Sequence, residues 1–366
     1  MRNHGPRSCF HTCLVEFKLG PTDVAFLARG FLTLAAMLLL ALQPARAQNE
    51  TSIHNTTPVA GPRRPATVPD GYVITPAGYF HASCVRSLAK GERLLSDGRV
   101  LHSDGTVDQQ AASCAYPHYS PAGNQVGSSA SNKSAQAATN TMTTNARATT
   151  APVINGYLLD ANATTGSPTT SYGALIARWT VPPQPTANDG QVLFFFPGFE
   201  DFDAVDSILQ PVLGWDGNPG QWTMASWNCC LNGIITNSPA VNVSPGDRIY
   251  GSITSTCTAG TLTCANWNVL TLDLSTGDST TLSDTPSDGQ IFNWAFGAVL
   301  EVDNIVSCDD FPPNRHLRFD KITVFDQDLK AIPDMKWTAY VDTPVTPQCD
   351  HALEVEDHGH TIRLRY

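Results

Sequence analysis

Short apolar runs broken by turn residues dominate the chain from residue 152 to residue 345. Runs such as ALIARWTV, QVLFFFP, NWNVLTLDLST and WAFGAVLEV are rich in β-branched and aromatic residues and are bounded by Gly, Pro, Asn or Asp. This pattern is typical of strands. No run of ten or more residues in this stretch has the 3.6-residue apolar period of an amphipathic helix. We therefore predict an all-β domain, built as a two-sheet antiparallel β-sandwich.

Composition excludes several function classes. The chain has 22 Lys and Arg against 33 Asp and Glu, which gives a formal net charge of −11. A nucleic-acid partner is excluded, because such binding needs a basic face that displaces counterions from phosphate. The sequence also contains no glycine-rich phosphate loop and no HExxH or similar metal-ligand motif. We expect neither a cofactor nor a metal ion.

The N-terminus has the features of a secretory signal peptide. An apolar run of 12 residues, Phe31–Leu42, follows Arg29, and it is too short to cross a bilayer, which takes about 20 helical residues. Ala45-Arg46-Ala47 then supplies the small-x-small pattern that a signal peptidase cleaves. We predict removal of residues 1–47 and a secreted or extracellular protein, with a periplasmic or cell-surface location as the alternative. No membrane contact is expected after cleavage.

Composition divides the rest of the chain into four parts. Residues 48–118 are an N-terminal segment in which LLSDGRVLHSDGTV carries two Asp-Gly dipeptides, a strong hairpin signal. Residues 119–151 are dominated by Ser, Ala, Asn and Thr and are expected to be a flexible linker. Residues 152–345 are the core domain. Residues 346–366 are expected to be a tail, in which a metal site at His358 and His360 is the less favoured interpretation.

Eight cysteines remain after signal cleavage, an even number that suggests disulfides in an exported protein. They are Cys84, Cys114, Cys229, Cys230, Cys257, Cys264, Cys308 and Cys349. We predict the pairs Cys84–Cys114 and Cys257–Cys264. Adjacent cysteines do not bond each other easily, so Cys229 and Cys230 are expected to bond elsewhere, with Cys308 and Cys349 as available partners. A zinc site is disfavoured by the lack of any CxxC motif or nearby histidine.

Carboxylates are the best candidates for chemistry. Between residues 152 and 345 there are 21 acidic and seven basic residues, but only one histidine, His316, and no GxSxG motif. Most of the acids are Asp in turns, where Asp bonds to the backbone. The two glutamates differ: Glu200 ends an apolar run, and Glu301 lies within one. A buried glutamate has a raised pKa and can act as a general acid or base. Alternatively, Glu301 is on the solvent face of a half-exposed strand.

Several segments in order resemble the eqolisins, a family of acid-acting glutamic peptidases, and more distantly the neprosin-type glutamic peptidases. They are RWTVPPQP, FFPGFEDFDAVDSILQPVLGW, ASWNCC, SPAVNVSPGDRIYGSITST, GAVLEVDNI and RFDKITVFD, and the resemblance spans roughly residues 174 to 326. The resemblance implies a concanavalin-like jelly roll. It also implies synthesis as a precursor, in which residues 48–150 would be an inhibitory propeptide.

The resemblance further implies roles for single residues. Glu301 and Gln210 match the catalytic pair, Glu200 matches a supporting acid, and Trp227 and Trp222 match the substrate groove. Ionised Glu301 would take a proton from the attacking water and return it to the leaving amine, while the Gln210 amide orients the water and donates to the oxyanion. The expected partner is a polypeptide substrate, and the expected state is a monomer.

Three other functions stay open from the sequence. One is a carbohydrate-binding or adhesive sandwich, because aromatic faces stack on sugar rings; its candidates are Trp215, Trp222, Trp227, Trp267 and Trp294. Another is a glycoside hydrolase with Glu200 and Glu301 as paired carboxylates. The last is a catalytically silent relative of the peptidases. The peptidase interpretation requires Glu301 and Gln210 to face one site, and it fails if Glu301 points into solvent.

Overall fold

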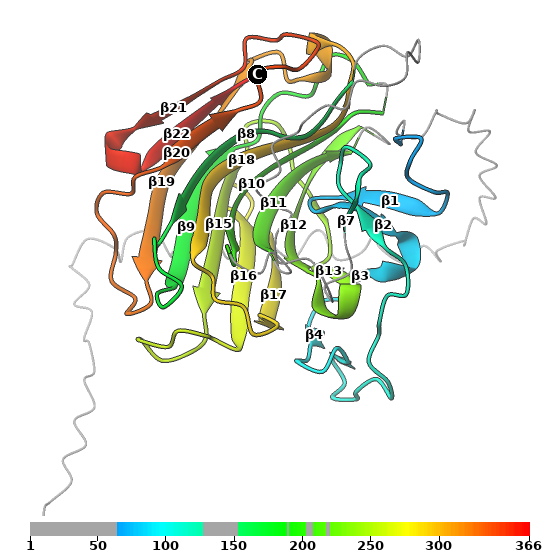
Figure 1. Ribbon diagram of the computed structural model, residues 1–366, viewed down its shortest axis with the longest axis vertical. Helices are drawn as coiled ribbons and strands as arrows, with labels where there is room; N and C mark the ends of the chain where they lie inside the picture. The colour runs from blue at the N-terminus through cyan, green and yellow to red at the C-terminus, as the bar shows by residue number, and fades with distance from the viewer. Residues whose placement is uncertain (1–63, 127–152, 189, 203–207, 217–219) are drawn as a thin grey trace, which may run out of the picture. The chain divides into compact units, whose positions relative to one another are not determined.

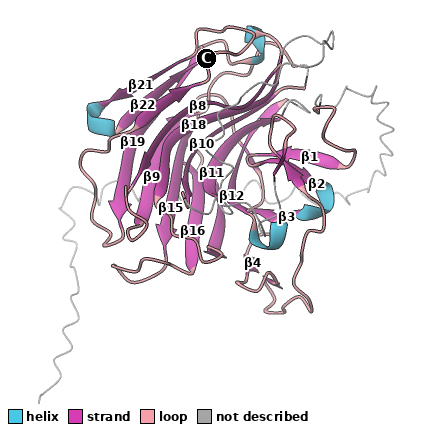
Figure 2. Ribbon diagram, viewed as in Figure 1, coloured by secondary structure: helices cyan, strands magenta, loops and turns pink. Residues whose placement is uncertain are grey.

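The computed structural model describes residues 64–126, 153–188, 190–202, 208–216 and 220–366. In these ranges the regular elements are strands and four single-turn 3-10 helices (Figures 1 and 2). The 3-10 helices are η1 (Ala82–Cys84), η2 (Leu231–Gly233), η3 (Cys308–Asp310) and η4 (Asp357–Gly359). The predicted signal peptide and most of the predicted linker lie outside the described residues. The prediction of an all-β sandwich is confirmed.

One layer of the sandwich is a nine-stranded sheet. In spatial order its strands are β20 (Thr338–Val341), β8 (Ile154–Thr164), β18 (Trp294–Ile305), β10 (Val192–Glu200), β11 (Ile208–Asp216), β12 (Gln221–Cys229), β13 (Ile235–Asn237) and β3 (Val85–Ser87), with β14 (Val241–Asn242) also paired to β12. Its pairs are antiparallel except that β3 runs parallel to β13. The N-terminal segment therefore contributes the edge strand of this sheet.

The second layer is a seven-stranded sheet. Its order is β17 (Ser279–Pro286), β16 (Asn266–Asp273), β15 (Arg248–Ser255), β9 (Tyr172–Thr180), β19 (His316–Asp326), β22 (Thr361–Arg365) and β21 (Ala352–Glu356). The C-terminal residues differ from the expected tail, because β21 and β22 form a hairpin in this sheet. Ile362 and Leu364 are fully buried, and burying such a side chain contributes about 1.5–3 kcal/mol. In β22 polar and apolar residues alternate, as Thr-Ile-Arg-Leu-Arg, and this pattern is typical of a strand.

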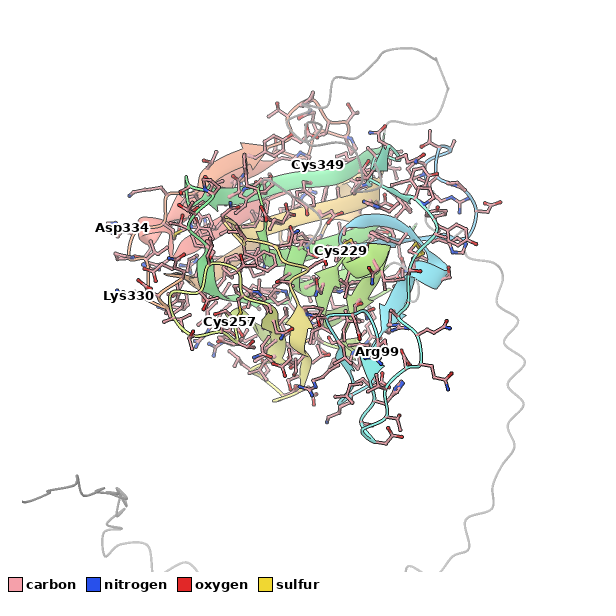
Figure 3. The ribbon with its side chains drawn as sticks, turned by 60° about the horizontal axis from the view of Figure 1, so that its bottom comes forward. Arg99, Cys229, Cys257, Lys330, Asp334 and Cys349 are labelled. Atoms are coloured by element: carbon pink, nitrogen blue, oxygen red, sulfur yellow. A yellow bond between two sulfur atoms is a disulfide. The ribbon has the colours of Figure 1, made fainter. Side chains whose placement is uncertain are left out.

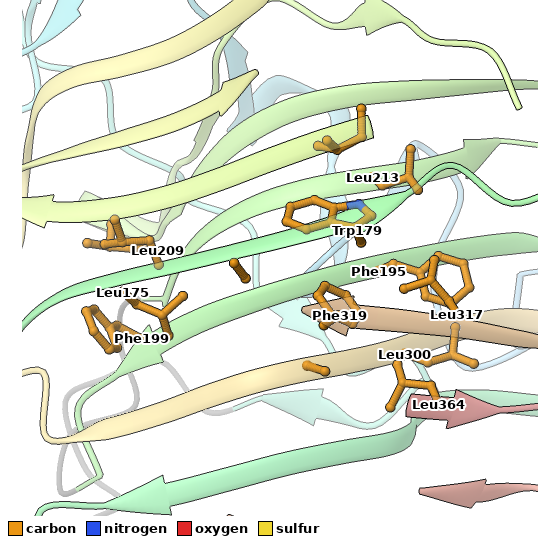
Figure 4. Close-up of a cluster of buried hydrophobic side chains, with 14 of the residues drawn as sticks. Leu175, Trp179, Phe195, Phe199, Leu209, Leu213, Leu300, Leu317, Phe319 and Leu364 are labelled. Carbon is orange, nitrogen blue, oxygen red and sulfur yellow. The ribbon is translucent and has the colours of Figure 1, made fainter. Parts of the chain in front are cut away.

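The main apolar core lies between the two sheets. Figure 4 shows part of it, including Phe195 and Phe199 from the nine-stranded sheet and Leu175 and Phe319 from the seven-stranded sheet. Residues of β10 alternate between this core and the opposite face, because successive strand side chains point to opposite sides. Odd-numbered positions such as Phe195 enter the core, and even-numbered positions face away from it.

Residues 64–126 are the described part of the N-terminal segment, and we call them the cover segment. Its small sheet has the order β1 (Tyr72–Thr75), β2 (Gly78–His81), β6 (His118–Tyr119) and β7 (Gln125–Val126). The hairpin of β4 (Arg93–Leu94) and β5 (Val100–Leu101) turns at the first predicted Asp-Gly dipeptide. Because β6 and β7 are ordered, the cover segment extends past residue 119, where the linker was predicted to begin.

Four disulfides occur among the described residues, and Figure 3 labels one cysteine from each of three of them. The predicted pairs Cys84–Cys114 and Cys257–Cys264 are confirmed. The prediction for the other four was wrong: Cys229 bonds its neighbour Cys230, and Cys308 bonds Cys349. The chain topology explains the difference. Cys349 precedes β21, and this position brings Cys349 beside Cys308 in η3 rather than beside Cys229 at the end of β12. No described disulfide joins the cover segment to the sandwich.

Candidate active site

Four of the predicted site residues lie on one face of the nine-stranded sheet. This outer face is the side turned away from the seven-stranded sheet. Glu200 and Gln210 occupy outer-face positions of β10 and β11, and Glu301 occupies one on β18, where it pairs with Phe194. Trp227 on β12 pairs with Gln210 and shares that face. Four strands that are separate in the sequence thus bring the predicted residues to one surface.

The prediction for Trp222 does not hold. It lies five positions before Trp227 on β12, and an odd spacing on a strand places two side chains on opposite faces. Trp222 is fully buried in the core, against Phe195 and Trp215. It therefore packs the sandwich and does not line the outer face. Trp215 and Trp267 are also buried in the core, which leaves Trp227 and Trp294 as the partly exposed indoles among the five candidates.

Strand register sets the spacing within the site. Gly198 lies beside Gln210, so a Cβ there would come within 3.7 Å of Gln210 Cγ. Glu200 is two residues along the same strand, β10, and is therefore diagonal to Gln210, a spacing that long side chains can bridge. Glu301 pairs four residues away from Gly198, at Phe194, which is about 13 Å along the strand. No hydrogen bond joins Gln210 to Glu301 among the described residues. Glu200, rather than Glu301, is the closer carboxyl to Gln210 by register.

Glu301 is enclosed by protein. Its side chain is 1% exposed, and neither carboxyl oxygen has a hydrogen-bond partner. Burial raises the pKa of Glu301 well above its usual range, and the neighbouring charges of Asp303 and Glu200 raise it further. The alternative that Glu301 lies on a solvent face is therefore wrong. In this closed arrangement the carboxyl stays protonated at pH values at which a free glutamate is ionised.

Three more carboxyls share the outer face with raised pKa values. Burial, together with the charge of Asp160, raises the pKa of Glu200 to about 8. Burial also raises the pKa of Asp160 on β8 to about 6, against the opposing effect of a 2.6 Å hydrogen bond from Asn162 Nδ2. The pKa of Asp303 on β18 is raised by burial to about 7. Such a cluster holds protons at pH values where free carboxyls have lost them.

Sequence reasoning missed Asp160 and Asp303. A signal for Asp303 was present, because it stands two residues after Glu301 and so shares its face in a strand. Asp160 interrupts the small apolar run of β8 in the same way that Glu301 interrupts β18. Tyr157, also on β8, was missed as well: burial and the charges of Glu200, Glu301 and Asp160 raise the pKa of its hydroxyl. Its side chain therefore remains a hydrogen-bond donor throughout the physiological range.

The cover segment occupies this face. The turn between β1 and β2 places the main-chain carbonyl of Pro76 where Gln210 Nε2 donates a 3.2 Å hydrogen bond to it. Tyr79 donates from its hydroxyl to Asp303 Oδ2 at 2.7 Å, with both groups buried. Phe80 belongs to a second apolar cluster, together with Phe196 of β10 and other outer-face residues. A peptide of the chain itself thus lies against the predicted site residues.

In the part of the chain that the structure describes, no group of three or more His, Cys, Asp or Glu side chains is arranged to hold a metal ion. No helix in the described ranges has the length and apolar character needed to span a membrane.

Comparison with known proteins gives distant structural likenesses only. No family model and no curated protein matches the chain. Scytalido-glutamic peptidase, solved with a peptide-based transition-state analogue, is 18% identical with a TM-score of 0.42, over 58% of this chain and 99% of that one. The eqolisin SCP-B, solved with the tripeptide Ala-Ile-His, is 18% identical with a TM-score of 0.40 over the same shares. Aspergilloglutamic peptidase from Aspergillus niger is 16% identical with a TM-score of 0.32, over 48% of this chain and 98% of that one. We therefore derive the function from the site.

Proposed function

We propose that the protein is a secreted, metal-independent peptidase of the glutamic type, held in a latent form by its cover segment. The observation that carries this proposal is the hydrogen bond from Gln210 Nε2 to the main-chain carbonyl of Pro76. The amide binds a peptide carbonyl on the same face as two buried glutamates, Glu200 and Glu301. A carbonyl of a substrate peptide would take the place of the Pro76 carbonyl once the cover segment leaves.

Once the face is open, each of its residues can carry out one part of peptide hydrolysis. Gln210 Nε2 donates to the scissile carbonyl oxygen and to the negative charge that develops on it, while its unpartnered Oε1 can accept from the attacking water. Glu200 and Glu301 repel each other's charge, so over an intermediate pH range the pair keeps one proton. The ionised member takes a proton from water, and a proton is returned to the leaving amine. We assign the base to Glu200, which the register places diagonal to Gln210, and a supporting role to Glu301, which lies farther along the strand.

Latency follows from the way in which the cover segment is attached. It occupies the Gln210 amide and covers the carboxyls, yet each described disulfide lies wholly within it or wholly within the sandwich. Cleavage between residues 126 and 153 would therefore leave it held by non-covalent contacts alone. Such a segment can act as a propeptide that is removed without reduction of any disulfide.

Activity on denatured protein from pH 2 to 7 tests the proposal, with the chain cut between residues 126 and 153 and the cover segment separated from the sandwich before the assay. We expect acid-range cleavage that chelators do not inhibit. Glu200→Gln and Gln210→Ala should each lower kcat by at least about 100-fold, because each removes a group that acts on the transition state. Glu301→Gln should lower kcat less. Glu354→Gln, on exposed strand β21, is the control and should cleave like the wild type. Full activity in Glu200→Gln, or glycan binding with no proteolysis, would reject the proposed mechanism.

A further inference from the structure

The interface between the cover segment and the outer face encloses carboxyls that no basic side chain neutralises. Glu200, Glu301 and Asp303 are at most 6% exposed, and no ion pair is formed by any of them among the described residues. Three of their oxygens, both of Glu301 and Oδ1 of Asp303, also lack a hydrogen-bond partner. An ionised carboxylate without partners is strongly disfavoured in a buried site.

The cover segment contributes to this enclosure. Tyr79 bonds directly to Asp303, two residues from Glu301 on the same strand face. Val299, two residues from Glu301 in the other direction, belongs to the apolar cluster that contains Phe80. Ile208, the partner of Glu200 across β10 and β11, belongs to that cluster too. Both glutamates are therefore flanked by positions that the cover segment packs against.

We propose that the cover segment is a proton-dependent latch, which docks on the outer face more tightly in acid solution and loosens towards neutral pH. Docking removes water from the carboxyls, so the docked state holds protons that the open state releases. This inference concerns the closure of the face. It holds whether or not the face is catalytic.

The titratable groups that face these carboxyls lie on β2 and β8. Tyr79 of β2, whose pKa burial and Asp303 both raise, donates to Asp303 as a neutral phenol. This hydrogen bond lowers the pKa of Asp303, against the larger raising effect of burial. Tyr157 and Asp160 face them from β8. Arg64 of the cover segment interacts electrostatically with Tyr79. Elsewhere, Arg93 and Asp284 join the cover segment to β17 through a partly exposed ion pair of 2.6 Å, which contributes little affinity in water.

The sign of the pH effect follows from the raised pKa values. A carboxyl whose pKa is higher in the docked state supports docking fully below its open-state pKa, which is about 4. That support is lost as the pH rises through the docked values, about 7 for Asp303 and about 8 for Glu200. Each group adds one proton to docking, so each weakens it about tenfold per pH unit within that window. Acidification alone would therefore not release the cover segment.

A cut chain measures this directly. A recognition sequence for a specific protease is placed between residues 126 and 153, the folded chain is cut, and intact masses confirm that both pieces persist. The dissociation constant of the two pieces is then measured by sedimentation from pH 5 to pH 8. We expect it to rise at least about tenfold per pH unit between pH 5 and 7.

Two matched variants test which groups cause the pH dependence of docking. Asp303→Asn keeps an oxygen that accepts from Tyr79 but cannot ionise, so it should remove about tenfold per pH unit from the dependence. Asp284→Asn breaks the ion pair at the other edge of the interface and should weaken docking equally at every pH. A wild-type dissociation constant that is constant from pH 5 to 8, or that falls with rising pH, would overturn the latch. This result needs no folded variant, and it is independent of whether peptide cleavage is found.

Discussion

At the scale of single residues, the molecule uses burial to keep acids protonated. Glu301 has no hydrogen-bond partner for either oxygen. A carboxyl that stays protonated in the folded chain but ionises in the unfolded chain lowers the free energy of unfolding as the pH rises. Groups of this kind are concentrated at functional sites. The same burial that prepares Glu301 for proton transfer therefore makes it a source of instability.

Replacement of Glu301 by Gln should reveal that cost as a function of pH. The unfolded glutamate ionises near pH 4.3, while the folded one stays protonated to much higher pH. The free energy of unfolding of Glu301→Gln should therefore gain on the wild type by about 1.4 kcal/mol for each pH unit above that point. Urea unfolding at pH 3.5, 5 and 6.5 measures the difference, and Glu354→Gln on exposed β21 is the matched control. A difference that does not change with pH would contradict the assigned burial.

At the scale of elements, the turn between β1 and β2 is the part of the cover segment that reaches Gln210. Gly78 ends this turn with φ of +94°, and a side chain there would collide with the carbonyl oxygen of Tyr119. That collision is with backbone, which cannot move without separating β2 from β6. The turn is therefore a point at which the cover can be loosened without touching the sandwich.

Gly78→Ala should detach the hairpin and leave the sandwich folded. We expect a loss of about 1–3 kcal/mol in the local stability of the cover segment, seen as faster protease cleavage within residues 64–126. Gly105→Ala is the matched control, because Gly105 has φ of +88° but no atom within 4 Å of the added Cβ. If the two variants are cleaved at the same rate, positive φ rather than the collision governs the effect.

The elements that sequence patterns predicted are those with local signals. Alternating apolar residues located the strands, and an Asp-Gly dipeptide located the β4–β5 hairpin. The bond between Cys229 and Cys230 was missed because adjacent cysteines were expected to bond elsewhere, whereas the expected partners, Cys308 and Cys349, bond each other. Trp222 was misplaced because its residue type suits a groove, but its odd spacing from Trp227 puts it in the core.

The sequence predicted some residues of the outer face and not the distances between them. Glu200, Gln210, Trp227 and Glu301 do share one face, as the resemblance implied. The register of β18 against β10 decides how far apart they lie, and a bulge shifts it between Phe196 and Gly198. Such a shift depends on packing: Gly297 lies where a Cβ would meet Ile362 of the opposite sheet. No local pattern in β18 encodes that contact.

At the scale of the whole molecule, the acidic composition and the buried carboxyls both make the fold more stable as the pH falls from neutral to mildly acid. With 33 acidic and 22 basic residues, lowering the pH reduces net negative charge and its self-repulsion. The raised pKa values of Asp160, Asp303 and Glu200, about 6, 7 and 8, mean that the folded chain holds protons that the unfolded chain releases. Both effects make the fold more stable in mild acid than at neutral pH.

The cover segment also contains two carboxyls with the opposite sign and a histidine with the same sign. Hydrogen bonds to His102 lower the pKa of Glu92 and Asp108, and the same bonds raise the pKa of His102. Those carboxylates stabilise the fold above their usual pKa and lose that effect in stronger acid, whereas His102 contributes below about pH 6.5 and loses its effect above its raised pKa. All three groups therefore favour the same interval, between about pH 4 and 6.5.

The uncut chain should therefore have its highest Tm near pH 5. Between pH 5 and 8 the unfolded chain has released protons that the folded chain still holds on the enclosed carboxyls. We expect a fall in Tm of at least about 5 °C, since a change of 1 kcal/mol in the free energy of unfolding moves the Tm of a domain of this size by about 2–4 °C. The combined variant Asp303→Asn with Glu301→Gln removes two of these groups and should flatten the profile between pH 5 and 8. His102→Gln should instead lower the Tm near pH 5 and have less effect at pH 8. A maximum at pH 8 in the wild type would show that other groups, and not the enclosed carboxyls, govern stability against pH.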